Sequence, residues 1–465
     1  MIKYAMCFFL PLMLSAVISR AQSPSYREVV YKFFDTYSPD PDVLPLFQKK
    51  KEGWIVKEYH YSNPDSTINP QVFWSAKDKS YESLNYEAAG TDTVAITQLV
   101  IKYWKDVGGD YEEYAFARNI YYGYPGWDWD VINKSLKERF ESDTLLESLA
   151  RAYSNYASAF VIEQYGNHFE NNDPDRSILP DSLAISRKRI NKFIGYEKKS
   201  LDAYEKLLTV NPSYQTMVGS VALKLANEHL YMYSDLLMAG DRADALKALQ
   251  GVHYPDSVLQ LYDACLKSVA KNAIIFTGGD NDTYAMWYLQ ETKGVRKDVV
   301  VVNNTLLGLR RYVKMLEILY NGNLFNTKSD VYFKNNFDYF QHNDIGISVP
   351  MEAGKFINYL NTYNFTDTEL NKLPNLVYKG EKIKRFYTTK VFFNKPSTEG
   401  ILNNMDHIIS LPSDYLLMNQ FMLIDIINTN LGKRPVYFTY LEPLMSNLLE
   451  PKEYTYQLNL NLEDK

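Results

Sequence analysis

Residues 273–307 read AIIFTGGDNDTYAMWYLQETKGVRKDVVVVNNTLL and decide the fold of the C-terminal half of the chain. AIIF at 273–276 and VVVV at 299–302 are short apolar runs of the kind that form buried strands. Between them, TGGDND is typical of a turn, TYAMWYLQET favours a helix, and Gly294 is a helix stop. A strand, a helix and a second strand in this order predict a βαβ unit and a parallel sheet.

The pattern continues towards the C-terminus. RFYTTKVFF at 385–393 alternates as a strand, SDYLLMNQFMLIDIINTN at 413–430 favours a helix, and PVYFT at 435–439 favours another strand. We therefore predict an α/β, Rossmann-like domain with a mainly parallel sheet over residues 256–465, with an insertion near 321–385.

Upstream of this domain the apolar residues follow a helical period. SLDAYEKLLTVNPSY at 200–214 is similar to the second helix of a tetratricopeptide repeat, and residues 221–249 look like a following repeat. Residues 22–109 read only as short elements. The fold class predicted from these patterns is mixed: an N-terminal all-α, tetratricopeptide-like helical array, placed at residues 110–255, followed by the α/β domain. A generic helical array remains the alternative, and either arrangement gives a concave face.

The first residues and the overall charge limit the classes of function. The chain has 465 residues and a net charge of −6, which argues against a general nucleic-acid binder. Lys3 precedes an apolar stretch at 4–17, and Ser19 and Ala21 are small residues before a cleavage point. The pattern predicts a signal peptide over residues 1–21, a periplasmic or secreted protein, and no membrane span after cleavage. A retained amphipathic anchor is the alternative.

The loop between the two predicted strands carries the candidate ligand-binding residues. It lies at the carboxyl end of a strand and opens a helix, where open α/β sheets place ligands. Parallel strands would bring the end of the second strand to the same edge. The candidates are Gly278, Gly279, Asp280, Asn281, Asp282, Thr283, Asn303 and Asn304.

Several interpretations of this loop compete. Phosphate binding is disfavoured because Asp280 and Asp282 would repel an anion and the G-x-G-x-x-G pattern is absent. The two carboxylates could hold Ca²⁺ or Mg²⁺, but Asp-x-Asp occurs four times in the chain and is a weak signal. An aspartyl nucleophile would need a different spacing. In the remaining interpretation an aspartate caps the helix and the glycines make the turn. We assign no catalytic residue, no cofactor and no metal site from the sequence.

Two stretches carry a family resemblance. Residues 273–307, with their GDND turn and WYLQ helix, and DYLLMNQFMLIDIINTNLGKRPVYFT at 414–439 resemble the periplasmic portion of bacterial protein O-mannosyltransferase-like membrane proteins. Those proteins carry a multi-span membrane half where their sugar chemistry is expected. Here a signal peptide and helices stand in its place. The resemblance therefore implies a detached accessory domain and transfers no catalytic residue.

Five triplets consist of Asp, then Ser or Thr, then an apolar residue or Thr. This pattern resembles an O-glycosylation acceptor signal of one group of Gram-negative bacteria. The candidate acceptors are Ser66, Thr93, Thr144, Ser182 and Ser257. Asp and Ser or Thr are also favoured at helix starts, which is the structural alternative.

These observations favour an exported, non-catalytic binding or scaffold protein of the cell envelope. Its helical array would bind a protein or peptide partner on the concave face, and the α/β domain would add a second binding surface, with a glycan as its candidate ligand. The alternative is a carbohydrate-active or metal-dependent enzyme, or a lectin, with its site at the GGDNDT loop.

Overall fold

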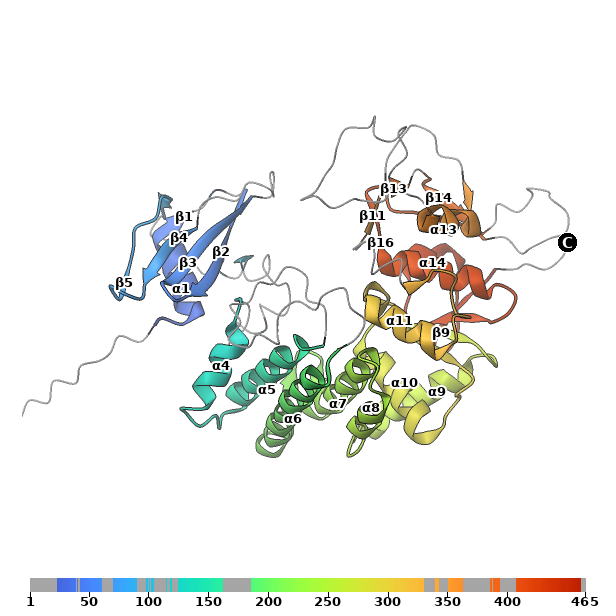
Figure 1. Cartoon of the computed structure of the whole chain (residues 1–465), viewed down its shortest axis with the longest axis horizontal. Helices are drawn as coiled ribbons and strands as arrows, with labels where there is room; N and C mark the ends of the chain where they lie inside the picture. Colours follow the sequence, from blue (N-terminus) through green and yellow to red (C-terminus); the bar gives the residue numbers. More distant parts are fainter. Residues whose placement is uncertain are drawn as a thin grey trace, which may run out of the picture. The chain divides into compact units, whose positions relative to one another are not determined.

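The computed structural model describes residues 23–38, 42–60, 70–89, 124–161, 185–329, 339–342, 350–362, 385–386, 388–393 and 407–460, with isolated positions at 40 and between 98 and 118. The chain divides into two compact units. The first comprises residues 1–130 with 167–170, and the second comprises residues 131–166 with 171–465. Figure 1 shows their helices and strands, coloured from blue at the N-terminus to red at the C-terminus.

The first unit packs a helix against a small antiparallel sheet. Its elements are α1 (Tyr26–Thr36), β1 (Tyr37–Ser38), β2 (Val43–Lys50), β3 (Gly53–His60), β4 (Gln71–Ser75), β5 (Ser80–Tyr81) and β6 (Glu87–Ala88). Ser25 and Glu28 form a capping box at the start of α1. Phe33 of α1 is buried against the rings of Phe47 and Phe73, which lie on the sheet β2-β3-β4-β5.

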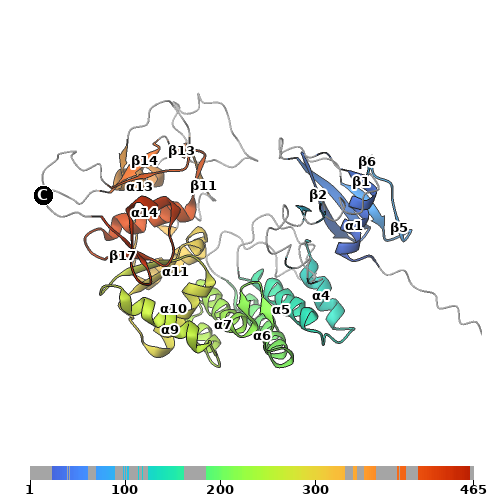
Figure 2. The ribbon, with the colours of Figure 1, turned by 180° about the vertical axis from the view of Figure 1, so that it is seen from behind.

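The helices that follow belong mainly to the second unit. They are α4 (Trp127–Ser135), which begins in the first unit, α5 (Asp143–Ser158), α6 (Arg187–Val210), α7 (Val221–Met238), α8 (Arg242–Ala248) and α9 (Asp256–Ser268). Ser142, Ser186 and Ser220 cap α5, α6 and α7 through their side chains. A short hairpin, β7 (Gln215–Thr216) and β8 (Gly219–Ser220), joins α6 to α7. Figure 2 shows α5, α6 and α7 side by side. Tetratricopeptide repeats remain a prediction.

The predicted βαβ unit is confirmed. The elements of this region are β9 (Ile274–Thr277), α10 (Asp280–Lys293), β10 (Val300–Asn303), η2 (Thr305–Gly308), α11 (Arg310–Leu319), α14 (Met418–Asn430), β17 (Val436–Phe438), η5 (Pro443–Leu448), β18 (Leu449–Pro451) and β19 (Tyr456–Leu458). Strand β9 lies between β10 and β17 and is parallel to both, with Ile274 opposite Val300 and Val436. Strands β19 and β18 continue the sheet in antiparallel fashion.

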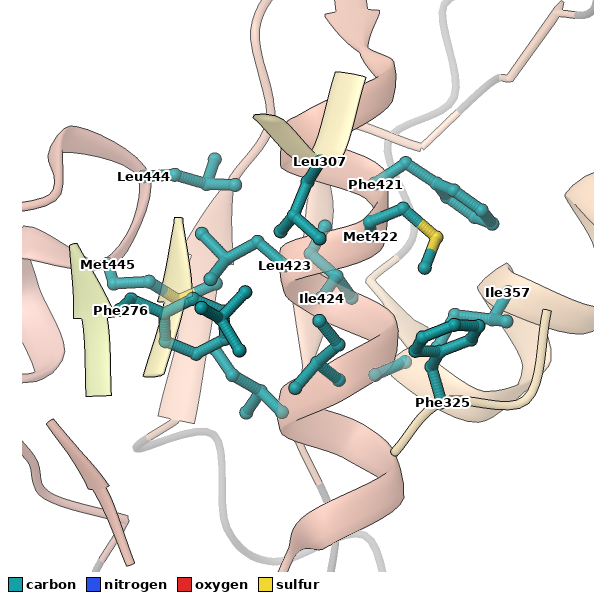
Figure 3. Packing of buried hydrophobic residues seen from close by; sticks show 14 of the residues in the cluster. Phe276, Leu307, Phe325, Ile357, Phe421, Met422, Leu423, Ile424, Leu444 and Met445 are labelled. Carbon is teal, nitrogen blue, oxygen red and sulfur yellow. The ribbon is translucent and has the colours of Figure 1, made fainter. Parts of the chain in front are cut away.

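Both faces of this sheet are covered, so its parallel strands are buried throughout. Phe276 and Val302 face a large apolar cluster that includes residues of α11 and α14. Ile275 and Val301 face the opposite cluster, which includes residues of α9 and α10. Figure 3 shows side chains of α14 packed towards the strands on one side and towards Phe325 and Ile357 on the other. The two-sided burial explains why these strands read as continuous apolar runs.

Two small sheets lie between the βαβ unit and α14 in the sequence. Their elements, with the accompanying helix α13, are β11 (Tyr339–His342), β12 (Met351–Glu352), α13 (Ala353–Thr362), β13 (Arg385–Phe386), β14 (Lys390–Phe392), β15 (Ile408–Ser410) and β16 (Tyr415–Leu417). The strand predicted over 385–393 is thus two short strands. Across the described ranges, no helix combines the length and the apolar composition needed to cross a membrane.

The predicted fold class is wrong in two respects. The N-terminal region is strand-rich rather than all-α, because residues 43–60 fold back across a turn at Lys51 and Glu52 and pair as an antiparallel hairpin. The C-terminal part is not mainly parallel, because its several small sheets contain many antiparallel pairs. A parallel connection needs a crossover of about a dozen residues or more, and the short segments after β17 do not provide one.

Candidate functional site

Asp282 of the GGDNDT loop is a structural cap. Its carboxylate accepts hydrogen bonds from the backbone N–H groups of Gly278 (2.9 Å), Gly279 (3.0 Å) and Thr283 (3.0 Å). The hydroxyl of Thr439, just after β17, donates to the same carboxylate at 2.5 Å. Asp282 therefore closes the turn before α10 and links it to the neighbouring strand.

Thr283 and Asn303 tie the ends of the two parallel strands together. The hydroxyls of Thr277 and Thr283 lie 2.6 Å apart, and the amide of Asn303 donates to the Thr283 hydroxyl at 2.9 Å. All three side chains are buried, and the hydroxyl of Tyr312 accepts from the backbone N–H of Asn303 at 2.9 Å. These contacts assign Thr283 and Asn303 to the sheet rather than to an open site.

Asn304 forms a second set of polar contacts at this strand edge, with Tyr440 and Glu442. Its amide nitrogen donates to the Tyr440 hydroxyl (2.7 Å) and to Glu442 (3.1 Å), while Tyr440 donates to Glu442 at 2.5 Å. Burial and the Glu442 carboxylate raise the pKa of Tyr440. The amide oxygen of Asn304 is buried and has no hydrogen-bond partner. A Cβ at Gly278 would lie 3.2 Å from the Tyr440 ring, so this position favours glycine.

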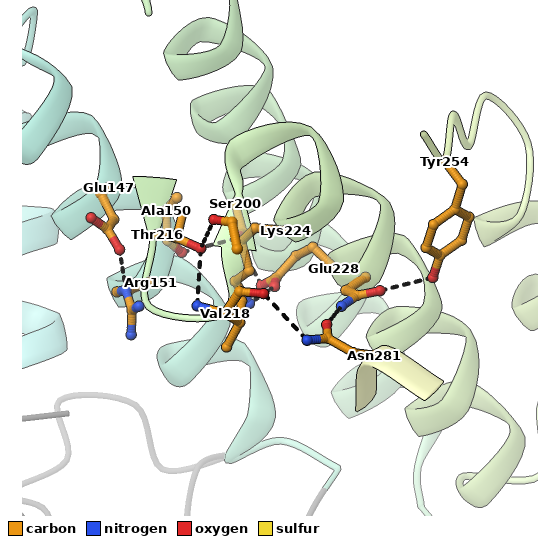
Figure 4. A network of polar contacts seen from close by, with 12 residues as sticks. Glu147, Ala150, Arg151, Ser200, Thr216, Val218, Lys224, Glu228, Tyr254 and Asn281 are labelled. Atoms are coloured by element: carbon orange, nitrogen blue, oxygen red, sulfur yellow. Dashed lines mark hydrogen bonds and ion pairs between the residues drawn. The ribbon is translucent and has the colours of Figure 1, made fainter. Parts of the chain in front are cut away.

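Asp280 and Asn281 interact with the helices instead of the strand edge. The side chain of Asn281 donates to the carbonyl of Val218 at 3.3 Å and accepts from Asn227 of α7 at 2.6 Å. Asn227 in turn accepts from the Tyr254 hydroxyl at 2.9 Å. Figure 4 shows these contacts beside a second set, in which Ser200 of α6 joins the carbonyl of Ala150 on α5 to Glu228 on α7. The sequence-predicted candidates are therefore divided between two places.

The second place is a group of four carboxyl side chains where α6, α7 and α10 meet. We call Glu197, Glu228, Asp235 and Asp280 the acidic cluster. The charge of Glu228 raises the pKa of each of the other three carboxyl groups, which places all three near it. On α7, Lys224, Glu228 and Asp235 recur at i, i+4 and i+11, which places them on one face of the helix.

Glu228 and Lys224 form an ion pair within the cluster. Burial alone would raise the pKa of Glu228, but Lys224 at 2.5 Å and hydrogen bonds from Ser154 and Ser200 hold it below its usual value. Burial would lower the pKa of Lys224, and the Glu228 carboxylate reverses that effect and raises it. The pair is therefore ionised.

Glu197 and Asp235 are buried carboxyl groups with oxygens that lack partners. Glu197 is 0% exposed, and neither of its carboxyl oxygens has a hydrogen-bond partner. Burial, then the charges of Glu228 and Asp235, raise its pKa well above the usual value. The nearby Ser154 hydroxyl lowers the pKa of Glu197, but it is not placed to form a hydrogen bond with either carboxyl oxygen. Asp235 is 2% exposed with one unpartnered oxygen, and burial raises its pKa in the same way.

Asp280 and Lys224 connect the cluster to solvent. Asp280 is exposed, yet protein surrounds it closely enough that burial is the main cause of its raised pKa. The side chain of Lys224 is 23% exposed. The cluster thus has two buried members, Glu197 and Asp235, while Asp280 and Lys224 contact solvent.

The arrangement suits binding of a polar or charged group. Asp280 and Asp282 do not converge on one ion, because backbone N–H groups and Thr439 occupy Asp282. Throughout the described part of the chain, no three His, Cys, Asp or Glu side chains are grouped so as to hold a metal ion. The predicted Ca²⁺ or Mg²⁺ at Asp280 and Asp282 therefore gains no support from the geometry.

Sequence reasoning missed Glu197, Lys224, Glu228 and Asp235. The signal was present on α7, where VALKLANEHLYMYSDLLM is strongly apolar and places charged residues on the face that packs against other helices. Buried charges are rarely found without partners or a function. Glu197 gave no such signal, because it lies in the charge-rich stretch GYEKKSLDAYEK.

The glycosylation candidates are only partly described. Thr144 lies in the first turn of α5 and is half-buried, and its backbone N–H donates to Asp143 at 2.8 Å. Ser257 is exposed in the first turn of α9. Ser66, Thr93 and Ser182 lie outside the described residues. Both described positions are at helix starts, so neither distinguishes an acceptor from a residue favoured there by helix capping.

Comparison with known families concerns the C-terminal part. A family model for TMEM260-associated domain 2 matches residues 260–459. This part of the chain is similar to that domain. The match supports, in a coarse form, the resemblance to a C-terminal domain of protein O-mannosyltransferase-like proteins. No curated protein and no solved structure matches the chain. The matched span covers fewer than half of the residues and includes Asp280 but not Glu197, Glu228 or Asp235.

Proposed function

We propose that this chain is an exported binding protein of the bacterial cell envelope whose helical part holds a protein or peptide partner. Export and envelope location rest on the pattern of residues 1–21. The partner-binding role rests on the acidic cluster. In this proposal the helices supply most of the binding groups and α10 contributes Asp280.

The single observation that carries the proposal is a set of buried, unpartnered carboxyl oxygens on Glu197 and Asp235, in one cluster with the solvent-exposed Asp280. A helix junction that served only packing would gain nothing from Glu197, because burying a polar group without a hydrogen-bond partner costs about 1–3 kcal/mol by protein mutational measures. Apolar residues of similar size would pack there at no such cost. A ligand group that reaches the cluster through Asp280 and Lys224 would offset this cost.

The strand edge is the place of a second candidate function. The unpartnered amide oxygen of Asn304, beside Tyr440 and Glu442, could accept a hydrogen bond from a ligand hydroxyl. This favours a glycan-binding surface on the α/β part, the lectin alternative raised from the sequence. Loss of retention on mannan or chitin resins in Asn304→Leu, with normal unfolding, would support it. Absence of retention by the unsubstituted chain would remove it.

Site-specific photocrosslinking in the native host tests the main proposal. A photoreactive residue at Met217, in the hairpin beside the Val218–Asn281 contact, would report on a partner that binds next to the start of α10. Asp202, exposed on α6, is the matched control position. We expect a discrete crosslinked adduct from position 217 and none from 202. The same products at both positions, or none at either, would exclude the helical part as the partner surface.

A further inference from the structure

We infer that the acidic cluster is a receptor for a basic side chain, the guanidinium of an arginine or the ammonium of a lysine on the partner. This inference rests on the proposed function and specifies the chemistry of its ligand. It follows from the excess of carboxyl groups over cations in the cluster, from the ion pair that the cluster already holds, and from the separation of Glu228 and Asp235 along α7.

Carboxyl groups outnumber cations in the cluster. Glu197, Glu228, Asp235 and Asp280 provide four carboxyl groups, and Lys224 is the cation that pairs with one of them. Burial makes ionisation of Glu197 and Asp235 costly. A cationic ligand would favour the charged carboxylates and supply the missing hydrogen-bond donors at the same time.

Lys224 shows how the cluster accommodates a cation. Its ammonium nitrogen lies 2.5 Å from a carboxylate oxygen of Glu228 and 5.4 Å from the centre of the Tyr204 ring. A carboxylate together with an aromatic face is a favourable setting for ammonium and guanidinium groups. Two more tyrosine hydroxyls lie at the cluster. Burial, and then the charge of Asp235, raises the pKa of Tyr231, while burial, and then the charges of Asp280 and Asp235, raises the pKa of Tyr284.

The spacing of the carboxyl groups favours an organic cation over a metal ion. Glu228 and Asp235 are seven residues apart on α7, or about 10 Å along the helix axis. Ca²⁺ and Mg²⁺ need several oxygens within about 2.0–2.6 Å of one point. A guanidinium carries five N–H donors in a plane, and the stem of a long side chain can pass Asp280 before reaching the inner carboxyl groups.

Calorimetric titration of residues 22–465 tests the inference directly. The probes are amidated octapeptides of alternating glycine and arginine, glycine and lysine, or glycine and citrulline, together with CaCl₂ and methyl α-mannoside. Citrulline keeps the shape of arginine and removes its charge. We expect the arginine or lysine peptide to bind and the citrulline peptide to bind at least about tenfold more weakly, the loss of one charged hydrogen bond. Equal binding of the citrulline peptide would overturn the inference. Heat from CaCl₂ or the mannoside, with none from the basic peptides, would overturn it as well.

Variants connect the binding to the cluster. Asp280→Asn should weaken binding of the basic peptide about tenfold, and the isosteric Asp235→Asn provides a second, buried variant. Asp202→Asn, an exposed carboxylate on α6, is the control and should leave affinity unchanged. Each variant is compared only if it unfolds at the same temperature as the unsubstituted chain or at a higher one. Equal affinity in all three variants would place the binding elsewhere. A crosslink at position 217 without basic-peptide binding would retain the proposed function and refute this inference, and failure of both experiments would refute both.

Discussion

Asp280 and Asp282 stand two residues apart in one motif, and the structure predicts opposite effects of the same substitution. Asp282→Asn and Asp282→Ala should destabilise the second unit, because four hydrogen bonds end on that carboxylate. Asp280→Asn should be neutral or stabilising. Protein that surrounds Asp280, together with the charges of Glu228 and Asp282, disfavours its ionised form.

The magnitude follows from the contacts of Asp282. A hydrogen bond to a charged group contributes about 1.5–3 kcal/mol, and replacement by water offsets part of this at the exposed Gly278. We therefore expect a cost of about 3 kcal/mol for Asp282→Ala. Asp282→Asn keeps one acceptor oxygen and places an NH₂ group against donors, so about 2 kcal/mol is expected. For a unit of more than 200 residues, about 2 °C per kcal/mol gives a fall of about 6 °C for the alanine variant.

Thermal unfolding followed by circular dichroism measures these shifts. The reasoning predicts the order Asp280→Asn, Asp282→Asn, Asp282→Ala from the highest to the lowest unfolding temperature. If Asp280→Asn lowers the unfolding temperature as much as Asp282→Asn, the assignment of the cap to Asp282 alone is refuted. An unchanged temperature in Asp282→Ala would show that the four hydrogen bonds add no net stability.

Four further predictions concern buried or strained positions. Burial raises the pKa of Glu197 in the folded chain above its value in the unfolded chain. The contribution of Glu197 to stability is therefore fully present below about pH 4.5, where the carboxyl group is protonated, and is lost as pH rises. Glu197→Gln should therefore gain stability relative to the unsubstituted chain between pH 5 and 9, and a constant difference would contradict this. Burial raises the pKa of Cys265 to about 12, so iodoacetamide at pH 8 should modify it only after denaturation, as peptide mapping can show. Gly53→Ala should unfold the first unit, since a Cβ would lie 1.8 Å from the carbonyl oxygen of Trp74 at a φ of +135°. Gly294→Ala, at a φ of +70° with open space around it, should cost only about 1 kcal/mol by urea denaturation.

Local sequence patterns predicted the βαβ unit because its signals are local. Apolar runs of four residues, a glycine-rich turn and the stop at Gly294 each act within a few positions of the chain. The left-handed φ of 70° at Gly294 is a conformation that glycine adopts at low cost. The same reasoning placed β17 and most of α14, since both are continuous apolar segments between clear boundaries.

The fold class could not be obtained in the same way. Strands β2 and β3 show mixed burial, and their hairpin is set by the cross-strand pairing of residues such as Phe47 and Val56. The direction in which β19 joins the sheet depends on where the chain returns after β17, which no local pattern encodes. Short strands with few alternating positions therefore read as irregular elements until their partners are known.

The acidic cluster needed tertiary information of a different kind. Glu197 and Asp280 are 83 positions apart in the numbering of the chain, and neither residue is unusual among its sequence neighbours. Only the packing of α6 against α5 and α7 shows that Glu197 is buried. A motif search finds Asp280 because it lies in a turn, but it assigns the residue to the strand edge with Asp282. The fold separates the two.

This separation bears on which part of the chain determines binding. The span similar to TMEM260-associated domain 2 contains Asp282, Asn303, Asn304 and the strand edge, together with Asp280 at the start of α10. Glu197, Glu228 and Asp235 come from helices before that span. A fragment limited to residues 260–459 would retain the cap and the edge but only one of the four carboxyl groups. Basic-peptide affinity should therefore require the helices, whereas any ligand of the strand edge should not, and comparing variants at Asp235 and Asn304 in the full chain separates the two surfaces.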